Sequence, residues 1–190
     1  IFSPAPSLKI ETERYVQNSS FNLSKNITLN NNSQNETRIW TSLALKIYEL
    51  ANYPAPLCNL ANVTVNSEPF GVYTHIETMD EKFLLREFGN SNGHLYEGQV
   101  IDFNKEWLPR WDAKTLHTDP IGNPIKAICE DLELPDDQLL SALNEHLNID
   151  NFITFWALVV KFEFKNKSQE VLATFWLLSI RLVVSKLQQD

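Results

Sequence analysis

Apolar side chains between residues 37 and 52 recur every three or four positions, the spacing of one helix face: Ile39, Leu43, Ile47 and Leu50. Leu45 and Tyr48 widen this stripe. The pattern predicts a helix over 37–52, and Thr37 is a suitable residue to cap its beginning. Residues 60–66 and 70–77 are rich in β-branched and alternating apolar residues, so they are predicted to form an antiparallel hairpin.

The same criteria place further elements on both sides of this region. Upstream, the segment SFNLSKNITLN alternates apolar and polar residues and predicts one or two short strands. Downstream, the patterns predict a helix over 80–88 ending at Gly89, a strand over 94–98, helices over 125–134 and 136–148, and a helix from 150 to 158. Asp136 or Asp137 is expected to cap the helix over 136–148, and residues 101–125 are expected to be a loop with short elements.

Composition narrows the class of protein. With 190 residues, 43% hydrophobic and 21% charged, the chain is expected to fold as one globular domain or slightly more. A net charge of −8 excludes a nonspecific nucleic-acid partner, because such binding needs a positive surface. The longest apolar stretch, Val171–Val184, is interrupted by Arg181 and is shorter than the roughly 20 residues of a membrane span, so we expect a buried helix or an aberrant tail.

Cysteine and asparagine leave two questions open. Cys58 and Cys129 allow one disulfide or two free thiols, and no Cys/His cluster with zinc-site spacing is present. The N-x-[ST] acceptor pattern for N-linked glycans occurs at seven asparagines: Asn18, Asn22, Asn26, Asn31, Asn35, Asn62 and Asn166. In a secreted eukaryotic protein these could carry glycans, but an Asn/Ser-rich stretch also produces the pattern by chance.

An ordered set of short motifs runs from the predicted helix at 37–52 to residue 98. It contains Arg38, Ala55-Pro56, Val65-Asn66-Ser67, Gly71-Val72-Tyr73, Glu77, Asp80, Phe83-Leu84 and the stretch from Gly93 to Gly98. This order resembles the CotH (spore coat protein H) kinase family, and the resemblance covers about residues 15–158. It implies an α+β, atypical protein-kinase-like fold with a small β-rich lobe and part of a helical lobe.

The resemblance also implies a domain organisation and an activity. The small lobe would be residues 1–77, the start of the helical lobe 78–158, and a divergent tail 159–190. The family transfers phosphate from ATP to serines of secreted or coat proteins, so ATP and a divalent metal ion are the expected cofactors. A protein substrate or a coat or surface protein is the expected partner, and the expected location is extracytoplasmic or secreted.

Phosphoryl transfer needs a cation at the phosphates, and three residues are candidates: Lys25, Lys46 and Arg38. An ordinary surface residue is the simpler explanation of each. Residues 77–80 would be the hinge at which adenine binds, and Glu77 would orient the hinge or contact the ribose. Alternatively, Glu77 caps the helix that begins at Asp80 or pairs with a nearby base.

The catalytic acids of the family are missing where they are expected. After Leu158 the acids are Glu163, Glu170 and Asp190, and none has the neighbours of the family's catalytic or metal-binding aspartates. We therefore expect no metal site and little or no phosphotransfer from this chain, and the tail suggests a frameshift or an alternative exon. The alternative function is a noncatalytic one, as a pseudokinase or a surface or coat interaction module.

Other chemistry has weaker support in the sequence. Asp102 and Asp112 are a possible metal pair, and either cysteine with a histidine is a possible thiol nucleophile. Trp107, Trp111 and Tyr96 are a possible aromatic platform for a sugar, although aromatic residues of a core would give the same pattern.

Overall fold

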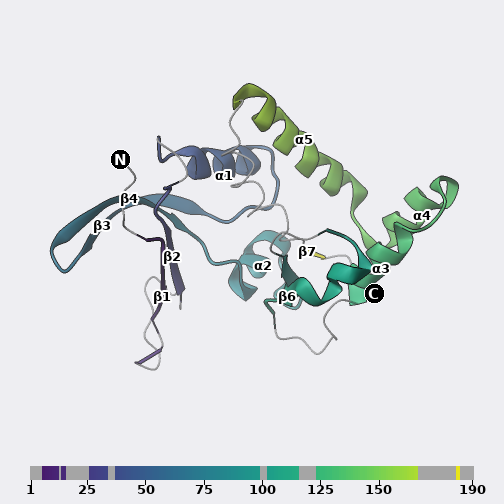
Figure 1. The fold of residues 1–190 in the computed structure, drawn as a ribbon, viewed down its shortest axis with the longest axis horizontal. Helices are drawn as coiled ribbons and strands as arrows, with labels where there is room; N and C mark the ends of the chain where they lie inside the picture. Colours follow the sequence, from purple (N-terminus) through teal and green to yellow (C-terminus); the bar gives the residue numbers. More distant parts are fainter. Residues whose placement is uncertain are drawn as a thin grey trace. The chain divides into compact units, whose positions relative to one another are not determined.

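The computed structural model describes residues 6–12, 14–15, 26–33, 37–98, 102–115, 123–166 and 183–184 (Figure 1). The chain divides into two compact units, Ile1–Met79 and Asp80–Asp190. The fold is α+β with antiparallel sheets, and each unit has a sheet and a hydrophobic core of its own.

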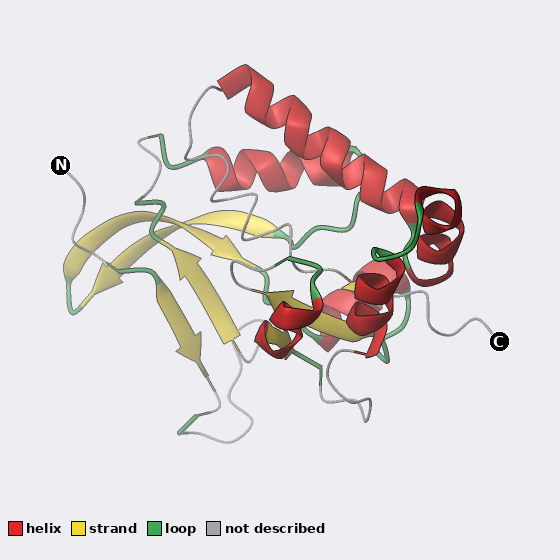
Figure 2. Cartoon of the chain, turned by 45° about the vertical axis from the view of Figure 1, so that its right-hand side comes forward, coloured by secondary structure: helices red, strands yellow, loops and turns green. Residues whose placement is uncertain are grey.

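The first unit is built on a four-stranded antiparallel sheet, whose strands are yellow in Figure 2. Its strands are β1 (Leu8–Glu11), β2 (Asn26–Asn30), β3 (Cys58–Val65) and β4 (Glu68–Ile76). Their spatial order is β1-β2-β4-β3, so β3 is an edge strand and β2 lies between β1 and β4. Part of the predicted strand region 18–29 lies outside the described residues, and β2 covers the rest.

The predicted hairpin is formed by β3 and β4, with a tighter turn than expected. Val65 pairs with Glu68, which leaves Asn66 and Ser67 as the two turn residues. Both have positive φ, 50° and 69°, as a type I′ turn requires. Pro69 is therefore part of β4, where the register shifts beside Val63 and Thr64.

A hydrophobic cluster fills one face of this sheet. Leu29, Val63 and Tyr73 are its buried members, one from each of β2, β3 and β4. The Tyr73 hydroxyl donates a hydrogen bond to the carbonyl oxygen of Pro6 over 3.0 Å, which satisfies the polar end of a buried ring. The alternation that predicted these strands thus places their apolar side chains in the core.

The predicted helix over 37–52 is α1 (Trp40–Leu50), but its start and its buried face differ from the prediction. The helix begins after Ile39, whose side chain forms no capping hydrogen bond, so the prediction that Thr37 caps it was wrong. Arg38 has a φ of 59°, and this left-handed residue separates Thr37 from the first turn. The buried side chains are Thr41, Ala44, Leu45 and Tyr48, whereas Ile39, Leu43 and Leu50 are exposed.

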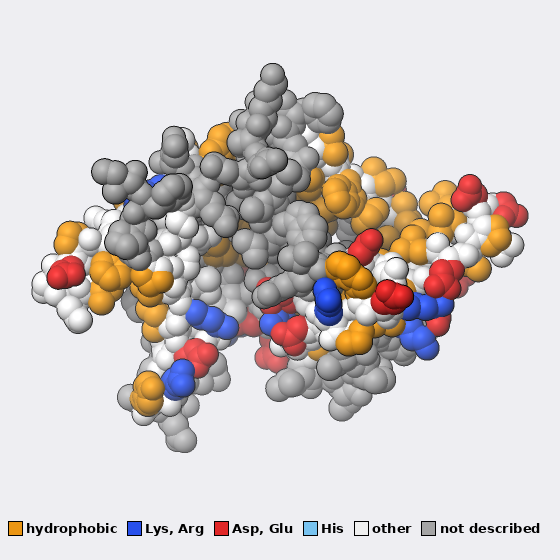
Figure 3. All heavy atoms as spheres, viewed as in Figure 1, with side chains coloured by type: hydrophobic (Ala, Val, Ile, Leu, Met, Phe, Trp, Pro, Cys, Tyr) orange, Lys and Arg blue, Asp and Glu red, His pale blue; other side chains and the backbone are white. Residues whose placement is uncertain are grey.

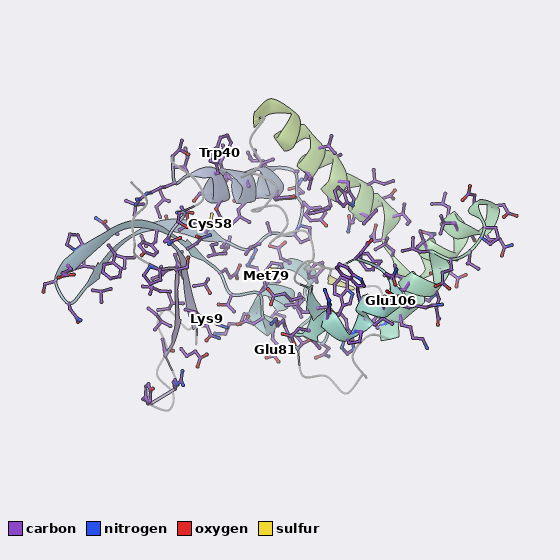
Figure 4. All side chains as sticks on the ribbon, viewed as in Figure 1. Lys9, Trp40, Cys58, Met79, Glu81 and Glu106 are labelled. Carbon is purple, nitrogen blue, oxygen red and sulfur yellow. The ribbon has the colours of Figure 1, made fainter. Side chains whose placement is uncertain are left out.

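Small side chains explain why this face of α1 is the buried one. Thr41 and Ala44 allow a helix to approach a sheet closely, and α1 contacts β3. Cys58, labelled in Figure 4, begins β3, and its sulfur atom lies 3.9 Å from the carbonyl oxygen of Ser42 on α1.

The second unit contains a three-stranded sheet of order β6-β5-β7 and several helices. Its elements are α2 (Glu81–Phe88), β5 (His94–Gly98), the 3₁₀ helix η1 (Lys105–Arg110), β6 (Trp111–Ala113), α3 (Asn123–Asp131), α4 (Asp136–His146), α5 (Ile149–Asn166) and β7 (Val183–Val184). The helix expected over 171–184 lies outside the described residues, except that Val183–Val184 form β7 beside β5.

Both predicted ends of α2 are confirmed. The Asp80 carboxylate accepts hydrogen bonds from the backbone nitrogens of Lys82 and Phe83, at 2.9 and 3.4 Å. Gly89 ends the helix in the left-handed conformation, with φ of 69°, which glycine adopts without steric cost.

The caps of the later helices differ from the prediction. Pro135 is the N-cap residue of α4, with no side-chain cap bond, so Asp136 and Asp137 lie in the first turn instead. There they still interact favourably with the positive end of the helix dipole. Asn148 precedes α5, and its Oδ1 accepts a hydrogen bond from the backbone nitrogen of Asn151 over 3.0 Å.

One hydrophobic cluster of the second unit gathers residues from β5, β6 and α3. Its buried members are Tyr96, Trp111, Ile125 and Cys129, with parts of η1 packed against them. Trp111 comes from the stretch that the sequence predicted as loop, because a strand of three residues is too short to show alternation.

Candidate functional site

The four residues predicted to bind the cofactor have different surroundings. Lys25 lies outside the described residues. Arg38, Lys46 and Glu77 all belong to the first unit, which also contains β2 and α1.

Glu77 links the end of β4 to the segment that precedes β3. Its Oε2 accepts a hydrogen bond from the backbone nitrogen of Leu57 over 2.9 Å, and its own backbone nitrogen donates to the Leu57 carbonyl over 2.8 Å. These two bonds extend the β3–β4 pairing by one residue pair. The capping role considered for Glu77 is filled by Asp80.

Lys46 lies on the exposed side of α1 and is paired on the same helix. Its ammonium nitrogen lies 2.5 Å from Oε1 of Glu49, three residues later, and both side chains are exposed. Glu49 is the sole acidic residue of α1. In protein kinases a strand lysine pairs with a glutamate of the following helix, but the buried side chains of α1 include no acid.

Arg38 lies over β4 just before α1. Its Nη1 is 3.1 Å from the position that a Cβ would occupy at Gly71, so the missing side chain of Gly71 makes room for the guanidinium group. Arg38 is half-buried, and we find no hydrogen bond or ion pair that joins its side chain to another residue in the described part of the chain. A guanidinium group with free donors can bind phosphate or carboxylate oxygens.

The segment between β2 and α1 is fixed by a polar pair that the sequence did not reveal. Asn32 and Thr74 are both buried; the Asn32 amide nitrogen donates to Thr74 Oγ1 over 2.9 Å, and the hydroxyl donates back to Asn32 Oδ1 over 3.2 Å. Asn32 has a φ of 52°, which asparagine tolerates better than most residues. The two residues are 42 positions apart, so a local pattern in the sequence could not identify this partner on β4.

In the second unit, a lysine pairs with Asp112, one member of the predicted metal pair, and with Glu97. Glu97 and Asp112 are opposite each other on β5 and β6. The Lys114 ammonium nitrogen lies 2.7 Å from Glu97 Oε2 and 2.5 Å from Asp112 Oδ2, and hydrogen bonds to both carboxylates raise the pKa of Lys114. The described residues contain no group of three or more His, Cys, Asp or Glu that could hold a metal ion.

Comparison with protein families agrees with the order of motifs on these elements. The model of the CotH kinase protein family matches residues 2–164, a range that includes β4 and reaches into α5. The chain belongs to the CotH kinase protein family. A comparison with curated proteins found no match.

The thiol and aromatic groups of this CotH-family chain belong mainly to its cores. Cys58 and Cys129 are both free thiols, and burial raises the pKa of each, which lowers the fraction of reactive thiolate. Tyr96 and Trp111 are buried, which leaves their rings inaccessible to a sugar. Trp107 packs against Arg110, whose guanidinium carbon lies 4.8 Å from the ring centroid.

Among the described residues, none of the helices is long and apolar enough to cross a membrane.

Proposed function

We propose that the chain is the nucleotide-binding part of a CotH-type, ATP-dependent protein kinase whose substrates are serines of secreted or coat proteins. The family match over residues 2–164 carries this proposal, because it extends across both compact units. In the proposed mapping, residues 1–77 are the small lobe of an atypical kinase-like fold and residues 78–158 begin its helical lobe. The location would be extracytoplasmic.

The order of elements in the first unit supports the small-lobe assignment. In protein kinases, the strand that carries the phosphate-binding lysine precedes the helix that carries its glutamate partner. Here β2 is an inner strand, α1 follows it, and the β3–β4 hairpin follows α1. On this mapping β2 and α1 are the equivalents of those two kinase elements.

Arg38 is the best candidate for the cation that binds the nucleotide phosphates. Lys46 is exposed and already paired with Glu49, whereas the guanidinium of Arg38 is half-buried beside Gly71 and has donors to offer. Bound ATP would supply the phosphoryl group, and Arg38 would hold its phosphate oxygens.

We further propose that this chain has little or no phosphotransfer activity. The acids that phosphoryl transfer needs must hold metal ions and position the acceptor hydroxyl. In the described part of the chain, Glu49 and Asp112 pair with lysines, and no acidic cluster suited to a metal is present.

Thermal shift and phosphotransfer assays on the full chain test these two statements separately. With millimolar ATP and Mg²⁺ or Mn²⁺ we expect a higher Tm, since a ligand that binds only the folded state stabilises it. In the phosphotransfer assay we expect no labelled phosphate to be transferred to a serine-containing protein. Arg38→Ala should reduce the Tm shift, while Lys46→Ala, the matched control, should keep it. Absence of any shift at millimolar nucleotide would overturn nucleotide binding.

The second candidate function is a noncatalytic interaction module that binds a coat or surface protein. One observation favours it: Ile153, Trp156 and Val160 on α5 are exposed and lie on one side of the helix, and hydrophobic side chains follow α5 in Figure 3. A chain that shows no nucleotide shift but binds coat proteins through this face would support the second candidate over the first.

A further inference from the structure

Three of the asparagines in N-x-[ST] patterns have side chains that the structure describes: Asn26, Asn31 and Asn62. Two of them, Asn26 and Asn31, already interact with other groups of the chain. Asn26 is half-buried at the start of β2 and takes part in further interactions. The Asn31 side-chain oxygen accepts from Ser7 Oγ over 3.2 Å and from the backbone nitrogen of Ser33 over 3.1 Å.

Asn62 differs from both in its accessibility. It lies in the middle of β3, which is the edge strand of the first unit's sheet, and its side chain is exposed. Thr64, which supplies the hydroxyl of the pattern, is exposed as well. We find no hydrogen bond from the Asn62 side chain to another residue of the described ranges, so its amide nitrogen is available.

The surroundings of Asn62 are unusually apolar for an exposed edge strand. Val72 is directly opposite Asn62 on β4, and Leu60 is two residues earlier on the same face of β3. Leu60 is 49% exposed and Val72 40%. No strand among the described residues pairs with the outer edge of β3. An edge strand with exposed apolar neighbours favours pairing with other chains, and a bulky polar group at Asn62 would prevent this.

We propose that Asn62 carries an N-linked glycan that covers Leu60 and Val72 at this edge. In the reaction, the Asn62 amide nitrogen forms a bond to C1 of the first sugar of a lipid-linked oligosaccharide diphosphate. The bond between C1 and the diphosphate oxygen breaks, the lipid diphosphate leaves, and the amide proton passes to solvent. The inference depends on the extracytoplasmic location in the proposed function, but not on nucleotide binding.

Peptide mapping of the full chain, secreted from a eukaryotic host, tests the proposal directly. Enzymatic removal of N-glycans in ¹⁸O-labelled water converts a glycosylated asparagine into labelled aspartate, which mass spectrometry assigns to a residue. We expect the label at Asn62 in the wild-type chain. Asn62→Gln and Thr64→Ala should lose it, and Thr64→Ser should keep it because serine retains the hydroxyl.

Asn59→Gln is the matched control, because Asn59 is exposed on the same strand but lies outside any N-x-[ST] pattern. This variant should retain the label at Asn62. An unlabelled Asn62 in secreted wild-type protein would overturn the proposal, whether or not other asparagines are labelled. Failure of the chain to enter the secretory pathway would overturn it as well. Neither result changes the Tm shift with ATP, so failure of the glycan proposal and failure of nucleotide binding are distinguishable.

Discussion

At the scale of single residues, Glu77 and Gly71 occupy motif positions whose structural roles are now visible. Glu77 exchanges two hydrogen bonds with Leu57, and Gly71 leaves space for the guanidinium group of Arg38. A residue can therefore match a kinase motif because the sheet needs it, independently of any ligand. Mutations separate these two explanations.

Replacing Glu77 by alanine should lower the free energy of unfolding by about 1 kcal/mol, the typical net value of one hydrogen bond. Glu77→Gln keeps an acceptor for the Leu57 backbone nitrogen and should lose less. Urea denaturation monitored by circular dichroism measures both. If Glu77→Gln is as stable as wild type but loses the Tm shift with ATP, the role of Glu77 would be at the ribose and not at Leu57.

Gly71→Ala should destabilise the first unit by about 1–2 kcal/mol, because an L-residue is strained at the φ of 98° that Gly71 adopts. The new Cβ would also lie 3.1 Å from Arg38 Nη1. In the double variant with Arg38→Ala, part of the lost stability should return because the guanidinium group no longer lies beside the new Cβ. The loss that comes from backbone strain should remain.

Gly93→Ala is the control for this series. A Cβ there meets the Leu84 side chain at 3.8 Å, an ordinary contact, so denaturant midpoints should change little. Equal losses for the two glycine variants would contradict the assigned role of Gly71.

At the scale of secondary-structure elements, the spacing of apolar residues predicted α1 but only part of its buried face: Leu45 and Tyr48 of the predicted stripe are buried. Apolar residues occur around most of this helix, so the pattern alone favoured Ile39, Leu43 and Leu50, which are exposed. The sheet instead contacts the side that carries Thr41 and Ala44, whose small side chains allow close packing. Helix propensity and spacing contain no information about the shape of the opposing surface.

Capping of α2 provides a prediction at the same scale. Asp80→Ala should cost about 1 kcal/mol of stability, because two backbone nitrogens in the first turn lose their acceptor. Asp80→Ser should retain most of this stability. Asp136→Ala is the comparison variant and should lose less, since Asp136 contributes only its charge near the positive end of α4 and the cap position belongs to Pro135. Thermal melts that show the same loss for Asp136→Ala would contradict the assignment of Asp80 as the cap.

At the scale of the whole molecule, each compact unit has its own core and one free cysteine. Cys58 belongs to the first unit and Cys129 to the second. The clusters around Leu29 and around Tyr96 share no residue. The two units are therefore expected to unfold at different denaturant concentrations.

Thiol alkylation in increasing urea should reveal this difference. In the native protein both thiols should react slowly, because burial raises the pKa of Cys58 and of Cys129 and so reduces the thiolate. Mass spectrometry of the two cysteine peptides should then give two distinct urea midpoints. Coincident midpoints would show that the chain unfolds as a single cooperative unit.

The candidate site was only partly predictable from the sequence. The motifs identified Arg38 and Glu77 as notable positions, and their order along the chain was sufficient to indicate the family. The sequence could not show that Lys46 pairs with Glu49, or that Lys114 bridges Glu97 and Asp112. Such pairs depend on side-chain direction and on strand register, which a linear pattern does not specify.

Elements that depend on neighbours along the chain were predictable from the sequence. One is the hairpin of β3 and β4, whose apolar and polar residues alternate along each strand. The other is α2, which Asp80 and Gly89 directly flank in the sequence. Only the tertiary structure fixes which side of α1 is buried and where the Asn32 amide finds its partner on Thr74. These features join residues that are distant in the chain, and their energies depend on packing and burial in three dimensions.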